Sequence, residues 1–252
     1  MTYDQIVRES ELDEQDIVAR LRYEWPLMRR KIIKARIPLV FHDFIYKTRQ
    51  HNQYIVIAVV TKQQIKQTDP QATIINACVR DTAYGKEVTY VSTGDWERYN
   101  QNDHGHLRTD VTRGQKLVQT FSPHLISRYN ERMGFNLTGM PLIRKFVMND
   151  MINDGIDFDD ESNLLVTVTR NGLLLGEAIG GDFFRQHYRT FITRRMIHET
   201  QVEKLLTMEA LGFDVGEIPD NKLLSAENAL HNVMLQPREV WERKEKTFLP
   251  NL

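Results

Sequence analysis

The chain has 252 residues and a formal net charge of −1, with 41% hydrophobic and 27% charged residues. This composition is typical of a globular protein with a substantial core, and it argues against indiscriminate coating of nucleic acid, which needs a broad basic surface. The single cysteine, Cys78, excludes an intramolecular disulfide and a cysteine-based zinc site, and it is typical of a reducing compartment.

The first residues contain no secretory signal, and no apolar run approaches the roughly 20 residues of a membrane helix. We therefore expect a cytoplasmic protein, or a virion component if a phage encodes it, with no membrane partner.

Residues 10–50 are predicted to be helical, because apolar residues recur there with helical periodicity. These are Leu12, Ile17, Val18, Leu21 and Trp25. Pro26 and Pro38 should each kink or end a helix, which favours two or three pieces over one straight helix. The basic run at 29–36 could contact RNA, although such runs are more often the solvated side of an amphipathic helix. Residues 10–50 could also provide a surface for a protein partner or for self-association.

After residue 50 the spacing of the apolar residues is no longer that of a helix, and the new pattern predicts a sheet. Tyr54–Val60 is rich in β-branched residues, which favours a buried strand, and residues 72–80 and 86–92 flank a Tyr84-Gly85 turn, which predicts a hairpin. Residues 94–114 show no periodicity, so we predict a long surface loop. Its two histidines, at positions 104 and 106, are a weak metal candidate because no third ligand follows at a suitable spacing.

The strongest functional signal lies in a helix that follows a short strand at 116–120. Ser122 is a favourable N-cap and Pro123 suits the first helical position. His124 then lies near the positive end of the helix dipole, which disfavours the imidazolium ion, and Arg128 and Arg132 follow at i+4 and i+8 on the same helix face. The pattern predicts a proton acceptor beside two anion-binding groups.

A structural alternative for this helix stays open. Its apolar stripe would bury one side and leave the face with His124 in solvent, where surface arginines commonly pair with acidic neighbours. The stripe consists of Leu125, Ile126, Tyr129 and Met133.

The remaining elements follow in order. A helix is predicted at 140–151, then an acidic loop, the clearest hairpin of the chain (164–179) with a type I′ turn at Asn171-Gly172, a strand at 188–193, and helices at 197–211 and 225–235. The acidic loop contains Asp154, Asp157, Asp159, Asp160 and Glu161. Such carboxylates can hold Ca²⁺ or Mg²⁺, but the spacing of an EF-hand is absent, and a solvated loop is the simpler interpretation.

These elements predict an α+β fold in which helices pack on an antiparallel sheet, with helical N-terminal and C-terminal appendages. The predicted divisions are a helical N-terminal arm at 1–50, an α+β core with the candidate site at 51–212, and a C-terminal helix and tail at 213–252.

Three motifs between about residues 115 and 200 carry a resemblance. They are Ser-Pro-His-x3-Arg-Tyr-x2-Arg, an Asn-Gly-x3-Gly hairpin, and Arg-Thr-Phe-Ile-Thr-Arg-Arg-Met-Ile. This segment, about a third of the chain, resembles a family of proteins from Bacteroides-type bacteria and their phages. It is also distantly similar to the small α+β toxin ribonucleases of the barnase/RelE-like group.

The resemblance implies an endoribonuclease that uses no metal or other cofactor. In that group a general base takes the proton of the RNA 2′-OH, this oxygen attacks the adjacent phosphate, and cationic side chains hold the developing charge. The resemblance assigns His124 as base or acid, and Arg128 and Arg132 as phosphate ligands. Thr190 or Arg189 would add a contact, and the pattern does not choose between them because neighbours in a regular strand face opposite ways.

A second hypothesis is a non-enzymatic phage or mobile-element protein, built on a related fold, that acts by interaction or assembly. Toxin ribonucleases are small and strongly basic, whereas this chain is long and near neutral, and a fold does not fix a function. The ribonuclease hypothesis predicts that the assigned side chains converge on one site.

Overall fold

The computed structural model describes residues 1–34, 39–61, 73–101, 107–151, 156–159 and 161–197. These residues form three α-helices and one sheet of nine strands, so the predicted α+β class is confirmed. The strand order is β1-β2-β3-β4-β5-β9-β8-β7-β6, and all neighbours are antiparallel except β5 and β9, which are parallel.

The helices are α1 (Tyr3–Lys34), α2 (Pro123–Met133) and α3 (Gly139–Phe146), which continues as a π-helical turn, Val147–Met151. The strands are β1 (Leu39–Lys47), β2 (Gln53–Thr61), β3 (Thr73–Thr82), β4 (Gly85–Gln101), β5 (Leu107–Phe121), β6 (Ile156–Asp159), β7 (Leu164–Val168), β8 (Gly172–Ala178) and β9 (Arg185–Thr193).

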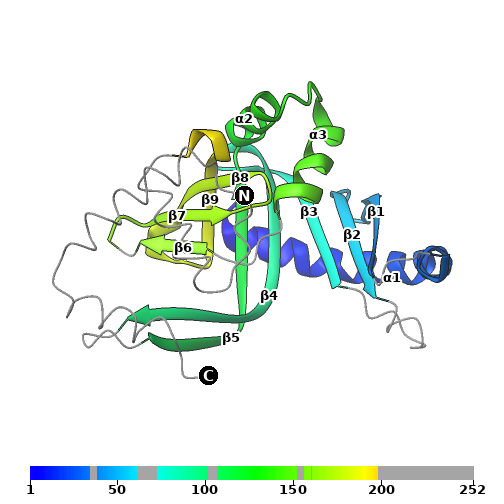
Figure 1. The fold of residues 1–252 in the computed structure, drawn as a ribbon. Helices are drawn as coiled ribbons and strands as arrows, with labels where there is room; N and C mark the ends of the chain where they lie inside the picture. Colours follow the sequence, from blue (N-terminus) through cyan, green and yellow to red (C-terminus); the bar gives the residue numbers. More distant parts are fainter. Residues whose placement is uncertain (35–38, 62–72, 102–106, 152–155, 160, 198–252) are drawn as a thin grey trace, which may run out of the picture.

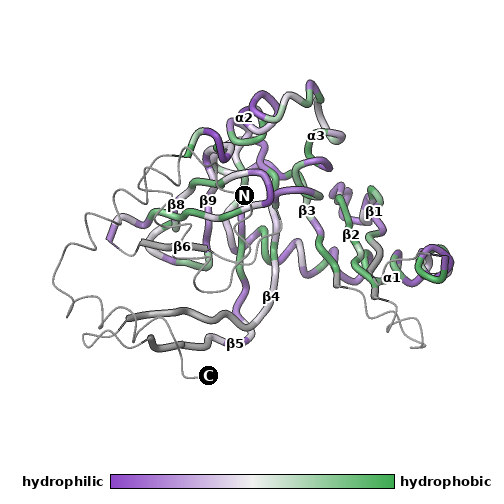
Figure 2. Tube along the Cα trace, viewed as in Figure 1, coloured by the Kyte–Doolittle hydropathy of each residue, from purple (hydrophilic) through white to green (hydrophobic). Residues whose placement is uncertain are grey.

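The helices cover both faces of the sheet (Figure 1). Helix α1 crosses one face from β5 to β1, which we call the α1 face, and α2 and α3 pack on the opposite, α2 face. Alternate residues of β2 divide between two cores as a result. Tyr54, Val56 and Ala58 pack with α1, whereas Ile55 and Ile57 belong to the larger core beneath α2 and α3. Figure 2 shows the apolar character of β2 and β8 that supports this arrangement.

Helix α1 is longer and less interrupted than the sequence predicts. It continues through Pro26, so the helix does not end at this proline, which was one of the two predicted outcomes. Proline removes the N–H that would bond to the Arg22 carbonyl, but both residues are exposed, and water can satisfy that carbonyl. The helical prediction was also wrong for Leu39–Lys47, which pairs with β2 along its whole length.

The predicted loop at 94–114 was also wrong for most of its length. Strand β4 runs to Gln101 and β5 begins at Leu107, and the two pair with an irregularity between Gly94 and Trp96. Each strand supplies the hydrogen-bond partners of the other, so this ribbon needs no hydrophobic alternation. Asp157 and Asp159 of the predicted acidic loop lie in β6.

Several predicted features lie outside the described residues. These are His104, His106, Asp154, Asp160, the helices predicted at 197–211 (apart from Ile197) and 225–235, and the segment 213–252. In the described part of the chain, no helix is long and apolar enough to cross a membrane.

The hairpin of β7 and β8 forms as predicted, but its turn differs from the expected type I′. Thr169 N donates to Gly172 O at 2.9 Å, so the two loop residues are Arg170 and Asn171, and Asn171 does not have the positive φ that a type I′ turn requires. Gly172 begins β8 instead. A Cβ there would lie 2.0 Å from the Ile192 carbonyl oxygen, so glycine is needed for the close approach of β9.

We expect Gly172→Ala to lower the free energy of unfolding by at least about 2 kcal/mol, because the added methyl group meets backbone rather than a movable side chain. Gly114→Ala is the control. Gly114 has φ +64 with open space around its Cβ, so only backbone strain of about 1 kcal/mol is expected. Urea denaturation monitored by circular dichroism measures both. Equal losses in the two variants would contradict this role of Gly172.

Candidate functional site

The local structure of α2 agrees with the sequence signals. Ser122 has extended backbone and its Oγ accepts a hydrogen bond from Leu125 N at 3.1 Å, while Gly134 ends the helix in the left-handed conformation. Ser122 also joins the helix to β9, because its N donates to Tyr188 O at 3.0 Å and its Oγ to Arg189 O at 3.1 Å. The start of α2 is therefore fixed to the centre of the sheet.

The three candidate side chains of α2 have separate surroundings. His124 is exposed in the first turn. Arg128 Nη1 lies 2.8 Å from Glu131 Oε2 on the same helix, in a pair that is largely in solvent. Arg132 donates to the carbonyl oxygen of Phe191 in β9. Within the described part of the chain, no contact joins His124 to either arginine.

Thr190 lies on the opposite face of the sheet from α2. Phe191 packs against Tyr129 of α2, with ring centroids 5.0 Å apart, so the neighbouring Thr190 and its partner Leu175 face the α1 side. A β-bulge at Arg189 shifts the register between Gly176 and Leu175. Tyr188 and Phe191 therefore both enter the core under α2, which a regular strand would not allow. The structure does not bring Thr190 together with His124.

Asp150 is a buried carboxylate at the end of α3 that the sequence reasoning missed. It is 0% exposed and accepts hydrogen bonds from the Tyr129 hydroxyl at 2.7 Å, the Thr169 hydroxyl at 2.9 Å, and both Asn171 N and Nδ2 at 2.9 and 2.7 Å. Burial, followed by the Asp150 charge, raises the pKa of Tyr129. Four donors saturate the carboxylate, so its role is to hold α2 and the β7–β8 turn together.

A second buried cluster joins β4, β5 and β9. His187 Nδ1 lies 2.9 Å from Thr120 Oγ1 and 3.2 Å from Glu87 Oε1, and the exposed Tyr84 ring stacks on the imidazole with centroids 4.4 Å apart. His187 and Glu87 are 3% and 0% exposed. A proton relay needs one partner on each ring nitrogen, but here both partners reach Nδ1. The cluster is a structural link rather than a catalytic triad, and no local sequence pattern could reveal it, because Thr120 and His187 are 67 residues apart.

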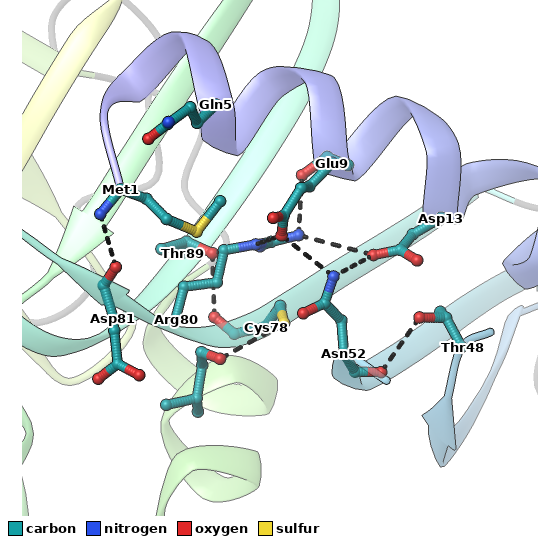
Figure 3. Close-up of polar contacts among 12 residues, drawn as sticks. Met1, Gln5, Glu9, Asp13, Thr48, Asn52, Cys78, Arg80, Asp81 and Thr89 are labelled. Atoms are coloured by element: carbon teal, nitrogen blue, oxygen red, sulfur yellow. Dashed lines mark hydrogen bonds and ion pairs between the residues drawn. The ribbon is translucent and has the colours of Figure 1, made fainter. Parts of the chain in front are cut away.

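A third polar cluster lies where α1 covers β2 and β3 (Figure 3). Arg80, 4% exposed, donates to Thr89 Oγ1 at 2.5 Å and to Ser10 Oγ at 3.2 Å, and it lies 3.6 Å from Glu9 and 3.9 Å from Asp13. Asp13 also accepts hydrogen bonds from Asn52 Nδ2 at 2.7 Å and from the Tyr54 hydroxyl at 3.0 Å. These contacts hold the N-terminal part of α1 on the sheet.

The charges of α1 are divided along its length. Residues 4–16 contain six acidic side chains and one basic one, whereas residues 20–34 contain six basic side chains and one acidic one. We call these segments the acidic half and the basic half of α1. Five of the six acidic side chains pair with four cations of the sheet and its connections, namely Arg80, Arg49, Lys116 and Arg185.

The basic half is anchored mainly through apolar residues and one polar chain. Lys31 Nζ lies 2.9 Å from His42 Nδ1 in β1, and His42 Nε2 lies 3.4 Å from Glu24 Oε2. An ammonium group can only donate, so Lys31 donates to Nδ1 of the His42 ring. Four exposed cations project from the other side of the helix and pair with no described residue: Arg22, Arg29, Arg30 and Lys34.

Cys78 lies in the core beneath α1, as expected of a small core residue, and it is 1% exposed. Burial raises the pKa of its thiol from 9.0 to about 11. The unfolded chain therefore loses this proton near pH 9 while the folded chain retains it. Stability from this group is complete below pH 9 and is lost as the pH rises toward 11.

We expect the free energy of unfolding to fall between pH 9 and pH 10 more steeply in the wild type than in Cys78→Ala. The difference in slope should average about 1 kcal/mol per pH unit, somewhat less than the value of about 1.4 kcal/mol for one whole proton, because the unfolded thiol is only partly ionised at pH 9. Urea denaturation under reducing conditions at several pH values gives the slope of the free energy of unfolding against pH for each protein. Packing lost in Cys78→Ala lowers this free energy equally at every pH and therefore leaves the slope unchanged. Parallel curves would contradict the raised thiol pKa.

Among the described residues, no group of three or more histidine, cysteine, aspartate or glutamate side chains is arranged to hold a metal ion. Comparisons with known proteins found no matching family model, no similar curated protein and no similar solved structure.

Proposed function

We propose that this protein binds RNA through the basic half of α1, and that it acts as a binding protein rather than as a nuclease. The observation that carries the proposal is the unequal use of charge along one helix. The acidic half meets cations from the sheet, whereas Arg22, Arg29, Arg30 and Lys34 remain exposed on a chain whose net charge is −1. A local basic surface on a near-neutral protein favours a polyanionic partner.

Side chains among these cations suit a single-stranded nucleic acid. Tyr23 is 72% exposed, and the Arg20 guanidinium lies over one face of its ring at 4.9 Å. An exposed ring beside cations can stack on a base while the cations contact phosphates. Contacts of this kind recognise phosphates and ring faces rather than particular bases. We therefore expect the affinity for RNA to depend strongly on salt concentration and little on the RNA sequence.

An anionic membrane surface fits less well. A helix that lies in a membrane interface inserts its apolar face into the lipid. In α1 that face is already occupied, because Ile17, Leu21, Met28 and Ile32 are at most 4% exposed against the sheet. The exposed aliphatic residues of the basic half, Leu27 and Ile33, are mixed with charges.

The arrangement of α2 also supports binding over catalysis. Arg128 and Arg132 have different partners, and Thr190 lies on the other face of the sheet. Phosphate-holding groups need to be placed in advance around one anion. Ribonuclease activity at the exposed His124 stays a prediction of the resemblance, and the experiment below includes it.

We expect Arg29→Ala/Arg30→Ala to weaken binding of a fluorescent single-stranded RNA by about tenfold at moderate salt. For the wild type, four phosphate contacts imply a slope of about −3 for the logarithm of the association constant against the logarithm of salt concentration, and the variant should lose about 1.4 of that slope. Fluorescence anisotropy measures both quantities. Arg170→Ala, which removes an exposed arginine from the β7–β8 turn, is the matched control and should bind as the wild type does.

Three outcomes would contradict the proposal. The double variant and Arg170→Ala could bind RNA equally well, or the wild type could bind anionic vesicles and not RNA. In the third, the labelled RNA is cleaved in the presence of chelator and cleavage is lost in a folded His124→Ala, which would establish the predicted ribonuclease in place of a binding protein.

A further inference from the structure

Strand β1 lies at one end of the sheet, and its outer edge pairs with no described strand. Its one neighbour among the described strands is β2. Thr48 follows β1 directly, and the register of β1 and β2, continued by one residue, places it opposite Asn52. Thr48 N donates to Asn52 O at 3.0 Å, so these two residues form a hydrogen-bonded pair of the ladder. Hydrogen bonding alternates along an antiparallel strand, so the even-numbered residues of β1 bond to β2. The backbone groups of Phe41, Asp43 and Ile45 therefore point outward.

The same three residues present their side chains on the α2 face of the edge. Phe41 and Ile45 are 51% and 48% exposed. Between them, Asp43 accepts a hydrogen bond from Arg144 Nε of α3, and this bond holds the pKa of the Asp43 carboxyl below its usual range. Edge strands are commonly protected by lysine or proline. Strand β1 has no proline, and its lysine, Lys47, is at its end.

We propose that two copies of the chain pair through β1 in an antiparallel ladder centred on Asp43. This register places Phe41 of each copy opposite Ile45 of the other, an aromatic and β-branched combination that stabilises cross-strand pairs. The two Asp43 residues meet at the two-fold axis, each neutralised by its own Arg144. The outward N–H and C=O groups of the edge then bond to those of the second copy.

The strand pattern favours a second copy over a foreign peptide. Apolar side chains stand at equal distances on either side of Asp43, so β1 is complementary to itself, as a two-fold interface requires. Pairing in one continuous sheet also leaves both α1 helices on the same face. The basic halves then approach each other near β1, and this repulsion opposes pairing until salt screens it.

Sedimentation equilibrium of the full chain from about 1 to 100 μM tests the proposal, because the fraction of the chain in a homodimer rises with the total concentration. At the highest concentration the average mass of the wild type should approach twice the chain mass of 29.6 kDa. Ile45→Lys should weaken the dimer by at least about tenfold. Ile45→Pro should do the same, since it removes a donor that β2 does not use. Leu164→Lys, a matched change at a strand residue that is 55% exposed, should leave the dimer unchanged.

Salt separates this proposal from RNA binding. Dimerisation through β1 should strengthen as salt rises, whereas RNA binding should weaken. A wild type that stays monomeric over the whole concentration range overturns the proposal and leaves the edge for another protein's strand. A dimer that survives both Ile45 variants also overturns it, because the contact between the copies then lies outside β1. A dimer that dissociates as salt rises overturns it as well, because attraction between opposite charges then holds the copies together.

Discussion

The parallel pairing of β5 with β9 is the constraint on which the rest of the structure depends. It spans the register pairs from Val118↔Arg185 to Phe121↔Tyr188. Side chains reinforce it on both faces: Phe121 stacks on Tyr188 at 5.3 Å in the core under α2, and Thr120 meets His187 under α1. Parallel strands need a crossover, and here that crossover carries α2, α3 and the strands β6 to β8. The position of α2 therefore follows from this pairing, since Ser122 comes directly after β5 and bonds to β9.

The charge division of α1 follows from what lies beneath each half. Near the parallel pairing, the α1 face is polar, with Arg80, Glu87, Thr120 and His187 buried there. Buried charges need partners, and Glu9 and Asp13 of the acidic half provide them for Arg80. Toward β1 the same face becomes apolar, with Val56, Ala58 and Val60. The basic half can therefore rest on aliphatic contacts and leave its cations in solvent, which places the surface available for a partner at the β1 end of the molecule.

Features that depend on sequence neighbours were predictable, and features that depend on strand partners were not. The Ser122 cap, strand β2 and the β7–β8 hairpin were predicted because capping, β-branching and turn residues act locally. The spacing of His124, Arg128 and Arg132 correctly placed them along one helix, but it contained no information on the partner that each finds. Strand β1 and the β4–β5 ribbon were missed because their pairing, rather than their pattern, determines them. The bulge at Arg189 reversed the expected alternation of β9 for the same reason.

The two proposals concern adjacent surfaces, and this adjacency couples them. Pairing through β1 would bring two basic halves of α1 to one face, where their like charges oppose the dimer. A polyanion that spans both helices would neutralise this repulsion and contact cations from both copies at once, so its affinity for the dimer would exceed its affinity for the monomer. Any ligand that prefers the dimer must stabilise the dimer by the same factor, because the two equilibria share one thermodynamic cycle. The repulsion between the two helices would therefore make self-association of the chain responsive to RNA, with the exposed Phe41 and Ile45 supplying the contact and the nucleic acid supplying the charge balance.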